Sequence, residues 1–209
     1  MRLTGGEYIV EYLIAEGVPY VVGIPGHGCL ALVDALRRRQ DRIRVLQARH
    51  EQSAVHLADG YYRIAGRPLA VFTSIGPGAV NTAVGLATAY VDSTAVLALT
   101  ANVHTHMRGR GVLQEIERAH WGDFPHVLEP VVKKYWSVER ADQLVRVLPM
   151  AFNAMLQQVK NRHDFDLFVL GYGRLNLDPD YLRTFFSSSQ DKAGGWNMSG
   201  YRNPQYDEL

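Results

Sequence analysis

Apolar residues in the first hundred positions fall into two alternating kinds of segment. Short continuous runs rich in Val, Leu and Ile predict strands at residues 20–24, 43–48, 69–74 and 94–101. Apolar residues at helical spacing predict helices at about 5–16, 30–39, 51–65 and 79–91, the first of which begins with the capping-box pair Thr4 and Glu7. This alternation is typical of an α/β fold in which helices cover both faces of a parallel sheet.

The alternation of strands and helices is less regular in the second half of the chain. Residues 102–128 are irregular and rich in His, Arg and Gly. The sequence then predicts a further strand at 131–138 and a closing helix at 141–156 that is interrupted or bent near Pro149. After about residue 157 only 165–173 is a credible strand and turn, and the remainder is rich in loop-forming residues. We therefore expect a domain over residues 1–158 and an appended, poorly ordered tail over 159–209.

Charge and cysteine content narrow the classes of function. The chain has 22 Lys and Arg against 21 Asp and Glu, a net charge of +1, which gives no general attraction for nucleic acid or an anionic membrane. No apolar stretch approaches the ~20 residues of a membrane helix, and Glu7 and Glu11 interrupt the apolar core that a secretory signal needs. With Cys29 as the single cysteine, these features predict a cytoplasmic protein that recognises its ligand locally.

The loops that follow the first three predicted strands hold the candidate chemistry. These loops are GIPGHG (23–28), ARHEQ (48–52) and SIGPGAVN (74–81), and they should converge because a parallel sheet brings the carboxyl ends of its strands to one edge. Glu51 lies in this set. An acid in the first turn of a helix is often there only because the helix dipole favours it, so a structural and a functional interpretation of Glu51 are both open.

Other known motifs do not fit these residues. His50 and His56 are six residues apart, whereas a zinc-protease helix needs histidines four apart. The loop GIPGHG lacks the third glycine of a dinucleotide fingerprint, neither Pro-Gly loop ends in the Lys-Ser/Thr of a P-loop, and the chain has no Gly-x-Ser-x-Gly elbow.

Four segments in register resemble one family. GVPYVVGIPGHGCLALVDAL, ARHEQSAVHLADGYYRIAG, SIGPGAVNTAVGLATAYVDSTAVLALTAN and GVLQEIE are similar to the N-terminal pyrimidine-binding domain of thiamine diphosphate enzymes of the acetolactate synthase type. The resemblance covers about residues 3–156. It implies the pyrimidine-binding α/β fold, thiamine diphosphate as cofactor, and decarboxylation or carboligation of a 2-oxo acid.

The resemblance also implies roles for individual residues. Glu51 is similar to the catalytic glutamate that hydrogen-bonds ring nitrogen N1′ of the aminopyrimidine. A carboxyl group that shares a proton with N1′ in a dry pocket prepares the cofactor to lose its thiazolium proton. Pro25 and Gly26 would border the pyrimidine ring, Pro77 and Asn81 would shape its pocket, and Gln114 would reach the reacting side.

A few positions depart from the synthase pattern. His27 stands where these enzymes usually have glycine, and either contacts substrate or faces solvent. His104 and His106 are better explained as surface residues than as metal ligands, because no carboxylate supports them. Arg108 and Arg110 could hold a substrate carboxylate or phosphate, although a solvated loop is the simpler explanation.

The other half of such a site has no counterpart in this sequence. In the family, the diphosphate is held through magnesium by a Gly-Asp-Gly motif and a following Asn, and the 209 residues contain no Gly-Asp-Gly. We therefore expect no metal ligand here and a partner domain or subunit in a homo- or hetero-oligomer. The alternative is a truncated or fused fragment without activity of its own, at most an interaction module.

The tail favours the alternative. FDLFVLGYG, LDPD, FFSSS and GGWNMSGYRNPQYDEL, within about residues 163–209, resemble a C-terminal fragment of extracytoplasmic solute-binding proteins for peptides or nickel. That family needs two large lobes and a secretion signal, so peptide binding is not expected to carry over.

Overall fold

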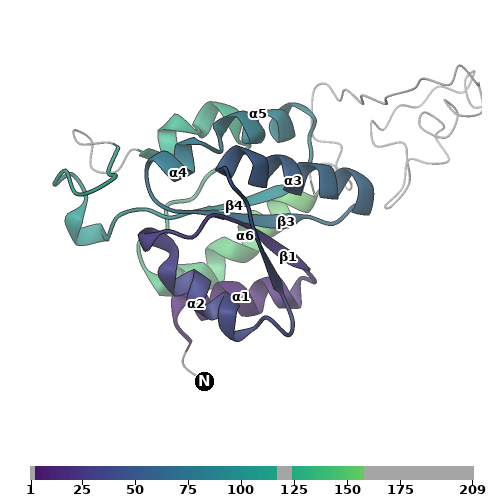
Figure 1. Cartoon of the computed structure of the whole chain (residues 1–209), viewed down its shortest axis with the longest axis horizontal. Coiled ribbons are helices and arrows are strands. Elements are labelled where there is room, and N and C mark those ends of the chain that lie inside the picture. Colours follow the sequence, from purple (N-terminus) through teal and green to yellow (C-terminus); the bar gives the residue numbers. More distant parts are fainter. Residues whose placement is uncertain (1–2, 117–123, 158–209) are drawn as a thin grey trace, which may run out of the picture. The chain divides into compact units, whose positions relative to one another are not determined.

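A computed structural model of the chain describes residues 3–116 and 124–157, and residues up to Phe152 belong to the compact unit that contains the sheet. The predicted strand at 165–173 and the tail lie outside the described residues. Helices and strands alternate along the chain (Figure 1), in the order α1 Gly5–Ala15, β1 Tyr20–Gly23, α2 Leu30–Arg38, β2 Arg44–Gln47, α3 Glu51–Ala65, β3 Leu69–Thr73, α4 Pro77–Val80, α5 Ala83–Val91, β4 Val96–Thr100 and α6 Leu144–Gln157.

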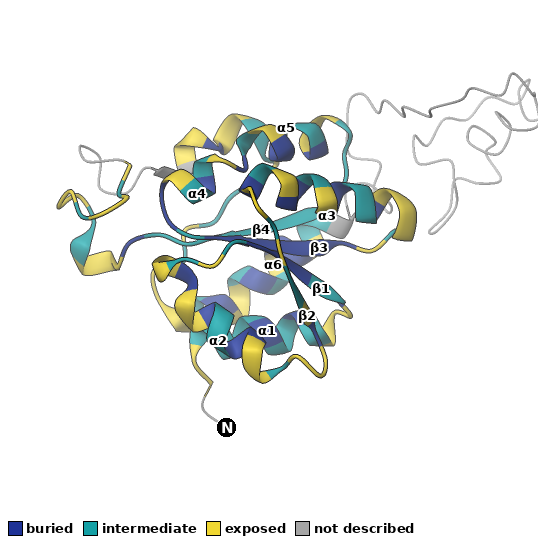
Figure 2. Cartoon of the chain, viewed as in Figure 1, coloured by how far each residue is buried: buried dark blue, intermediate teal, exposed yellow. Residues whose placement is uncertain are grey.

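The sheet confirms the predicted fold class. Among the described residues it has four strands in the order β2-β1-β3-β4, and every neighbouring pair is parallel. The register places Val22 of β1 opposite Leu46 on one side and Val71 on the other. All five residues of the central strand β3 are buried, which explains why its sequence is continuously apolar rather than alternating (Figure 2).

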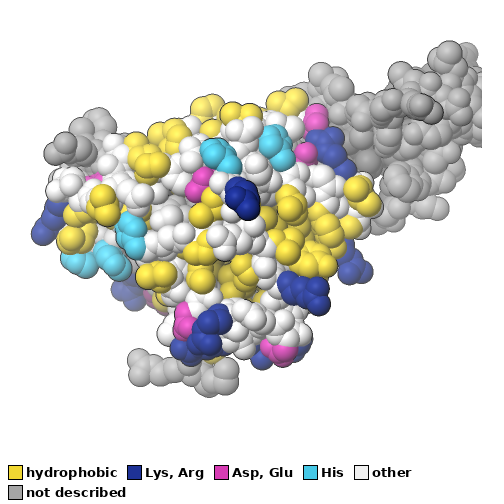
Figure 3. Space-filling model, viewed as in Figure 1, with side chains coloured by type: hydrophobic (Ala, Val, Ile, Leu, Met, Phe, Trp, Pro, Cys, Tyr) yellow, Lys and Arg dark blue, Asp and Glu magenta, His cyan; other side chains and the backbone are white. Residues whose placement is uncertain are grey.

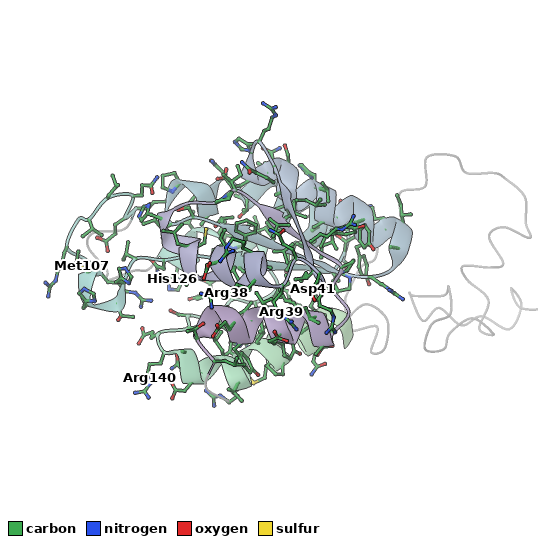
Figure 4. All side chains as sticks on the ribbon, turned by 60° about the horizontal axis from the view of Figure 1, so that its bottom comes forward. Arg38, Arg39, Asp41, Met107, His126 and Arg140 are labelled. Carbon is green, nitrogen blue, oxygen red and sulfur yellow. The ribbon has the colours of Figure 1, made fainter. Side chains whose placement is uncertain are left out.

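Helices cover both faces of the sheet (Figure 1). On one face α3 and α5 pack against each other and against side chains such as Val22 and Val71. The other face is covered by α1, α2 and α6, where the ring of Tyr12 meets that of Phe152 edge to face at 5.9 Å. Salt bridges join Arg38 of α2 to Glu7 and Arg39 to Glu11 on α1 (Figure 4).

The polar residues at the C-terminal half of α3 are tied to the segment before β4. The carboxylate of Asp59, 6% exposed, accepts from Nε of Arg63 with both oxygens at 3.1 Å and from the hydroxyl of Thr94. Arg63 also pairs with Asp92. Because a buried carboxylate must be paired, this network fixes the axis of α3, the helix that begins at Glu51.

The structure differs from the sequence predictions in three places. The helix predicted at 79–91 is two helices, α4 and α5, separated at Asn81 and Thr82. No strand forms at 131–138, since the exposed Lys133 and Lys134 in the middle of that run cannot be covered on both faces of a sheet. The closing helix α6 is continuous through Pro149. No helix among the described residues is long and apolar enough to cross a membrane.

Candidate functional site

The candidate site lies where the strand order reverses. From β1 the chain passes through α2 to β2 at the edge, and then returns through α3 to β3 on the other side of β1. The loops after β1 and β3 therefore leave neighbouring strands and turn to opposite faces of the sheet, which is the position where open parallel sheets bind ligands.

The two Pro-Gly loops touch at this point, as the sequence predicted. A Cβ atom added at Gly26 would collide with Cβ and Oγ of Ser74, and one added at Gly28 would collide with Cγ2 of Ile75. Only glycine permits this approach of the loop after β1 to the loop after β3.

Glu51 is the first residue of α3 and points into this region. Its exposed fraction is 8%, and its Oε2 accepts a hydrogen bond from Nδ2 of Asn81 at 3.0 Å. Among the residues that the structure describes, Oε1 has no hydrogen-bond partner. A Cβ atom at Gly78 would lie 3.1 Å from Oε1, so glycine at this position leaves space beside the free oxygen.

The N-terminus of α3 is capped by His50 rather than by Glu51. Nδ1 of His50 accepts the backbone N–H of Gln52 at 3.2 Å. The capping function is thus assigned to a neighbouring side chain, and the Glu51 carboxylate is available for contacts across the site.

The loop Pro25–Gly26 is held by the thiol of Cys29. The N–H of Gly26 donates to Sγ at 3.3 Å and the thiol donates to the carbonyl of Gly26 at 3.2 Å. Cys29 is 5% exposed, and burial raises the pKa of its thiol. A buried thiol with a raised pKa is a poor nucleophile, so Cys29 shapes the loop. Pro25 itself is exposed and Gly26 is half-buried.

The third group of predicted residues surrounds Gly76. This glycine has a φ of 57°, and a Cβ atom on it would overlap the carbonyl oxygen of Gln114. Pro77 is exposed in the first turn of α4, and Gln114 is exposed with a φ of 62°. The structure therefore brings Gln114 next to the loop that contains Pro77, although Pro77 lies 37 positions before Gln114 in the sequence.

One residue of the site was not anticipated from the sequence. Oγ of Ser74 is buried and, among the described residues, has no hydrogen-bond partner. Ser74 lies beside Gly26, and its Cβ would be 3.7 Å from a Cβ at Gly78. Ser74 is the last residue of the predicted strand and precedes a Pro-Gly loop, and this position in the sequence could have indicated that it belongs to the site.

The residues that depart from the synthase pattern lie at the margin of this region. His27 is exposed in the 3₁₀ helix His27–Cys29, and the rings of His104 and His106 stack with centroids 5.7 Å apart. Figure 4 shows Met107 of the same segment on a loop that extends beyond the sheet. Arg108 is paired with Glu139 at 2.9 Å, while Arg110 is exposed. No group of three possible metal ligands occurs in the described part of the chain.

Comparison with known proteins identifies a family. The family described as "Thiamine pyrophosphate enzyme, N-terminal TPP binding domain" matches residues 3–121. The chain is 37% identical over 151 residues to the acetolactate synthase large subunit of Haemophilus influenzae. It is 39% identical over 150 residues to the acetolactate synthase isozyme 3 large subunit of Escherichia coli.

A third relative is archaeal, the probable acetolactate synthase large subunit of Methanocaldococcus jannaschii, with 37% identity over 150 residues. Each of these matches covers 72% of this chain. They cover 25%, 25% and 24% of the respective relatives, so the matched region is about a quarter of their length.

Proposed function

This chain belongs to the thiamine pyrophosphate enzyme family through its N-terminal TPP binding domain, and we propose that its Glu51 pocket holds the aminopyrimidine ring of thiamine diphosphate. In this proposal the pocket is half of a site that acts on 2-oxo acids, by decarboxylation or carboligation. The observation that supports it most directly is the state of Glu51, a largely buried carboxylate with one oxygen held by Asn81 and the other free.

The residues present fit a flat heteroaromatic ring. Gly78 leaves space beside Oε1 of Glu51 that a larger side chain would fill, and Gly26 lets the loop after β1 lie directly against Ser74 of the loop after β3. In this proposal Pro25 and Pro77 border the ring, and Ser74 offers a buried hydroxyl that has no partner within the described residues.

Glu51 is the proposed catalytic residue. Oε1 would share a proton with ring nitrogen N1′, while the hydrogen bond from Asn81 to Oε2 keeps the carboxylate from rotating away. In this proposal Gln114, whose backbone lies against Gly76, reaches the reacting side of the cofactor. When bound, thiamine diphosphate supplies the electron sink for breaking or forming the bond next to a carbonyl carbon.

The diphosphate half of the site is proposed to come from a domain outside these 209 residues. Diphosphate binding through magnesium requires oxygen ligands, and the sequence lacks the Gly-Asp-Gly motif that supplies them in the family. Figure 3 shows hydrophobic side chains at the surface where α5 lies, among which Val84, Tyr90 and Val91 are more than half exposed. Such residues suit burial against another domain or subunit in a homo- or hetero-oligomer.

Because Cys29 is the single cysteine, we assign the protein to a reducing compartment, the cytoplasm.

The test is reconstitution. The chain is mixed with a diphosphate-binding domain of an acetolactate synthase-like enzyme, thiamine diphosphate and magnesium, and 2-oxo acid consumption is measured. Glu51→Gln should lower turnover by ~10²–10⁴-fold, the usual contribution of a proton-transferring group. Glu129→Gln, a change at an exposed glutamate outside the site, is the matched control. Equal turnover of Glu51→Gln and wild type would show that the assignment of Glu51 is wrong.

A different result would favour the alternative function. In this second outcome the wild-type chain binds its partner, while the complex neither binds thiamine diphosphate nor consumes a 2-oxo acid. In that case the chain acts as an interaction module without catalysis.

A further inference from the structure

The segment before Gln114 is closed into a loop by the side chain of the next residue, Glu115. Its Oε1 accepts the backbone N–H of Gly109 at 2.5 Å and its Oε2 accepts the backbone N–H of Gly111 at 2.8 Å. The N–H of Glu115 donates in turn to the carbonyl of Val112 at 3.0 Å. One carboxylate therefore binds two main-chain donors at the opposite end of a short loop.

The backbone conformation at both donor positions favours glycine. Gly109 and Gly111 have φ values of 73° and 66°, in the left-handed region. Alternation of this backbone conformation directs successive N–H groups toward one point and creates a small anion-binding hollow. Here the bound anion is the chain's own carboxylate, and both contacts are charge-assisted hydrogen bonds.

Gln114 is held in a conformation that the loop must enforce. It is one of two non-glycine residues with positive φ among the described residues, and for such a residue this conformation is unfavourable by roughly 1 kcal/mol. Its carbonyl oxygen lies so close to Gly76 that any Cβ there would overlap it. The position of Gln114 thus depends on the loop on one side and on Gly76 on the other.

We propose that Glu115 is a positioning residue, which closes the loop 109–115 and thereby holds Gln114 at the carboxyl edge of the sheet beside the Glu51 pocket. The functional part of this proposal rests on the proposed function of that pocket. The closure of the loop stands independently of it. Substitution of Glu115 by Gln retains one acceptor oxygen and so one of the two contacts, whereas Ala removes both.

Limited proteolysis tests the closure in the full chain. Arg108 and Arg110 flank Gly109, so trypsin reports the opening of this loop directly. We expect cleavage after Arg110 to be about tenfold faster in Glu115→Ala and intermediate in Glu115→Gln, because proteolysis follows the population of the open form. Glu129→Ala should match wild type. Equal cleavage rates for Glu115→Ala and wild type, with unchanged thermal unfolding, would overturn the proposal.

A double-mutant cycle in the reconstituted complex tests whether Glu115 acts through Gln114. Glu115→Ala should lower kcat by about tenfold with little change in KM, and should have no further effect when Gln114 is already Ala. Additive losses would refute positioning through Gln114.

If the wild-type complex is inactive, the proposed function fails, and hydrogen–deuterium exchange of the full chain decides the positioning. Glu115→Ala must then accelerate exchange in residues 74–80 as well as in 109–115. Faster exchange in 109–115 alone would leave Gln114 independent of Glu115 and refute the proposal.

Discussion

Two helical glycines offer a matched test of how closely α3 and α5 pack. Gly60 is inside α3 and a Cβ atom there would meet nothing within 4 Å. Gly85 is inside α5, and a Cβ atom there would lie 2.6 Å from Cβ of Val55 and 3.2 Å from the carbonyl oxygen of Gln52, both on α3. The same chemical change, Gly to Ala, should therefore have opposite effects at the two positions.

The magnitudes follow from known substitution effects. Gly60→Ala should stabilise the protein by ~0.5–1 kcal/mol, because alanine reduces the conformational entropy of the unfolded chain and favours the helix. Gly85→Ala receives the same gain but must separate the helices, an overpacking effect of ~1–3 kcal/mol, so a net loss of ~0.5–2 kcal/mol is expected. At ~2–4 °C per kcal/mol for a domain of this size, the ~1–3 kcal/mol between the two variants should give a difference in Tm of ~2–12 °C.

Thermal and urea unfolding followed by circular dichroism measure this difference. The urea m-value should be the same for both variants, which shows that they expose the same surface on unfolding and differ in stability and not in the compactness of the unfolded chain. If Gly85→Ala is as stable as Gly60→Ala, then α3 and α5 are not in the close contact described, and the position of Glu51 at the start of α3 needs another explanation.

Four further predictions concern single sites. Gly78→Ala should weaken thiamine diphosphate binding in the reconstituted complex by roughly tenfold, measured by calorimetric titration, because its methyl group would crowd Oε1 of Glu51. Thr4→Ala should destabilise the chain by ~1 kcal/mol in urea unfolding, through loss of the capping box. Hydrogen bonds from Thr4 lower the pKa of Glu7, so the Glu7 contribution should be present above pH ~4.3 and lost as the pH falls through the lowered folded-state pKa, as unfolding at several pH values would reveal. Alkylation of Cys29 at pH 8 should be much slower in the folded than in the urea-unfolded chain, since burial raises the pKa of the thiol and little thiolate is present.

The parallel sheet was predictable because its local and global signals agree. The strands Leu69–Thr73 and Tyr20–Gly23 are apolar at every position except the terminal Thr73 and Gly23, and the helices α2 and α3 between strands are amphipathic, so each of these segments indicates the state that it adopts in the fold. Where those signals conflict the prediction was wrong. The run at 131–138 has β-forming residues at its ends, but Lys133 and Lys134 in its middle are exposed and no strand forms.

The candidate site was predictable only at the level of its loops. Parallel strands imply that residues 23–28, 48–52 and 74–81 share an edge, and the structure confirms contact between Gly26 and Ser74 and between Glu51 and Asn81. The break between α4 and α5, which presents Asn81 to Glu51, was not visible in a sequence that reads as one helix. The closure of residues 109–115 by Glu115 depends on backbone angles at two glycines, and the residue pattern showed only that glycines are present.

The sequence left two interpretations of Glu51 open, an acid that stabilises the start of a helix and a functional group of the site. In the structure Glu51 is at the start of α3 and also extends across the site. If Glu51 served only the start of α3, its carboxylate would be expected to accept a backbone N–H of the first turn or to lie in solvent. Instead His50 accepts that N–H, and Glu51 extends to Asn81, 30 positions away in sequence. Among the described residues Oε1 of Glu51 has no hydrogen-bond partner, while Oε2 is held by Asn81. A bound group that donates a hydrogen bond to Oε1 adds a contact that only the folded state makes, so the fold should be more stable with the ligand than without it. Thermal unfolding of the reconstituted complex at increasing thiamine diphosphate concentrations should therefore show a rise in Tm that Glu51→Gln reduces, and an equal rise in both would mean that Oε1 does not contact the ligand.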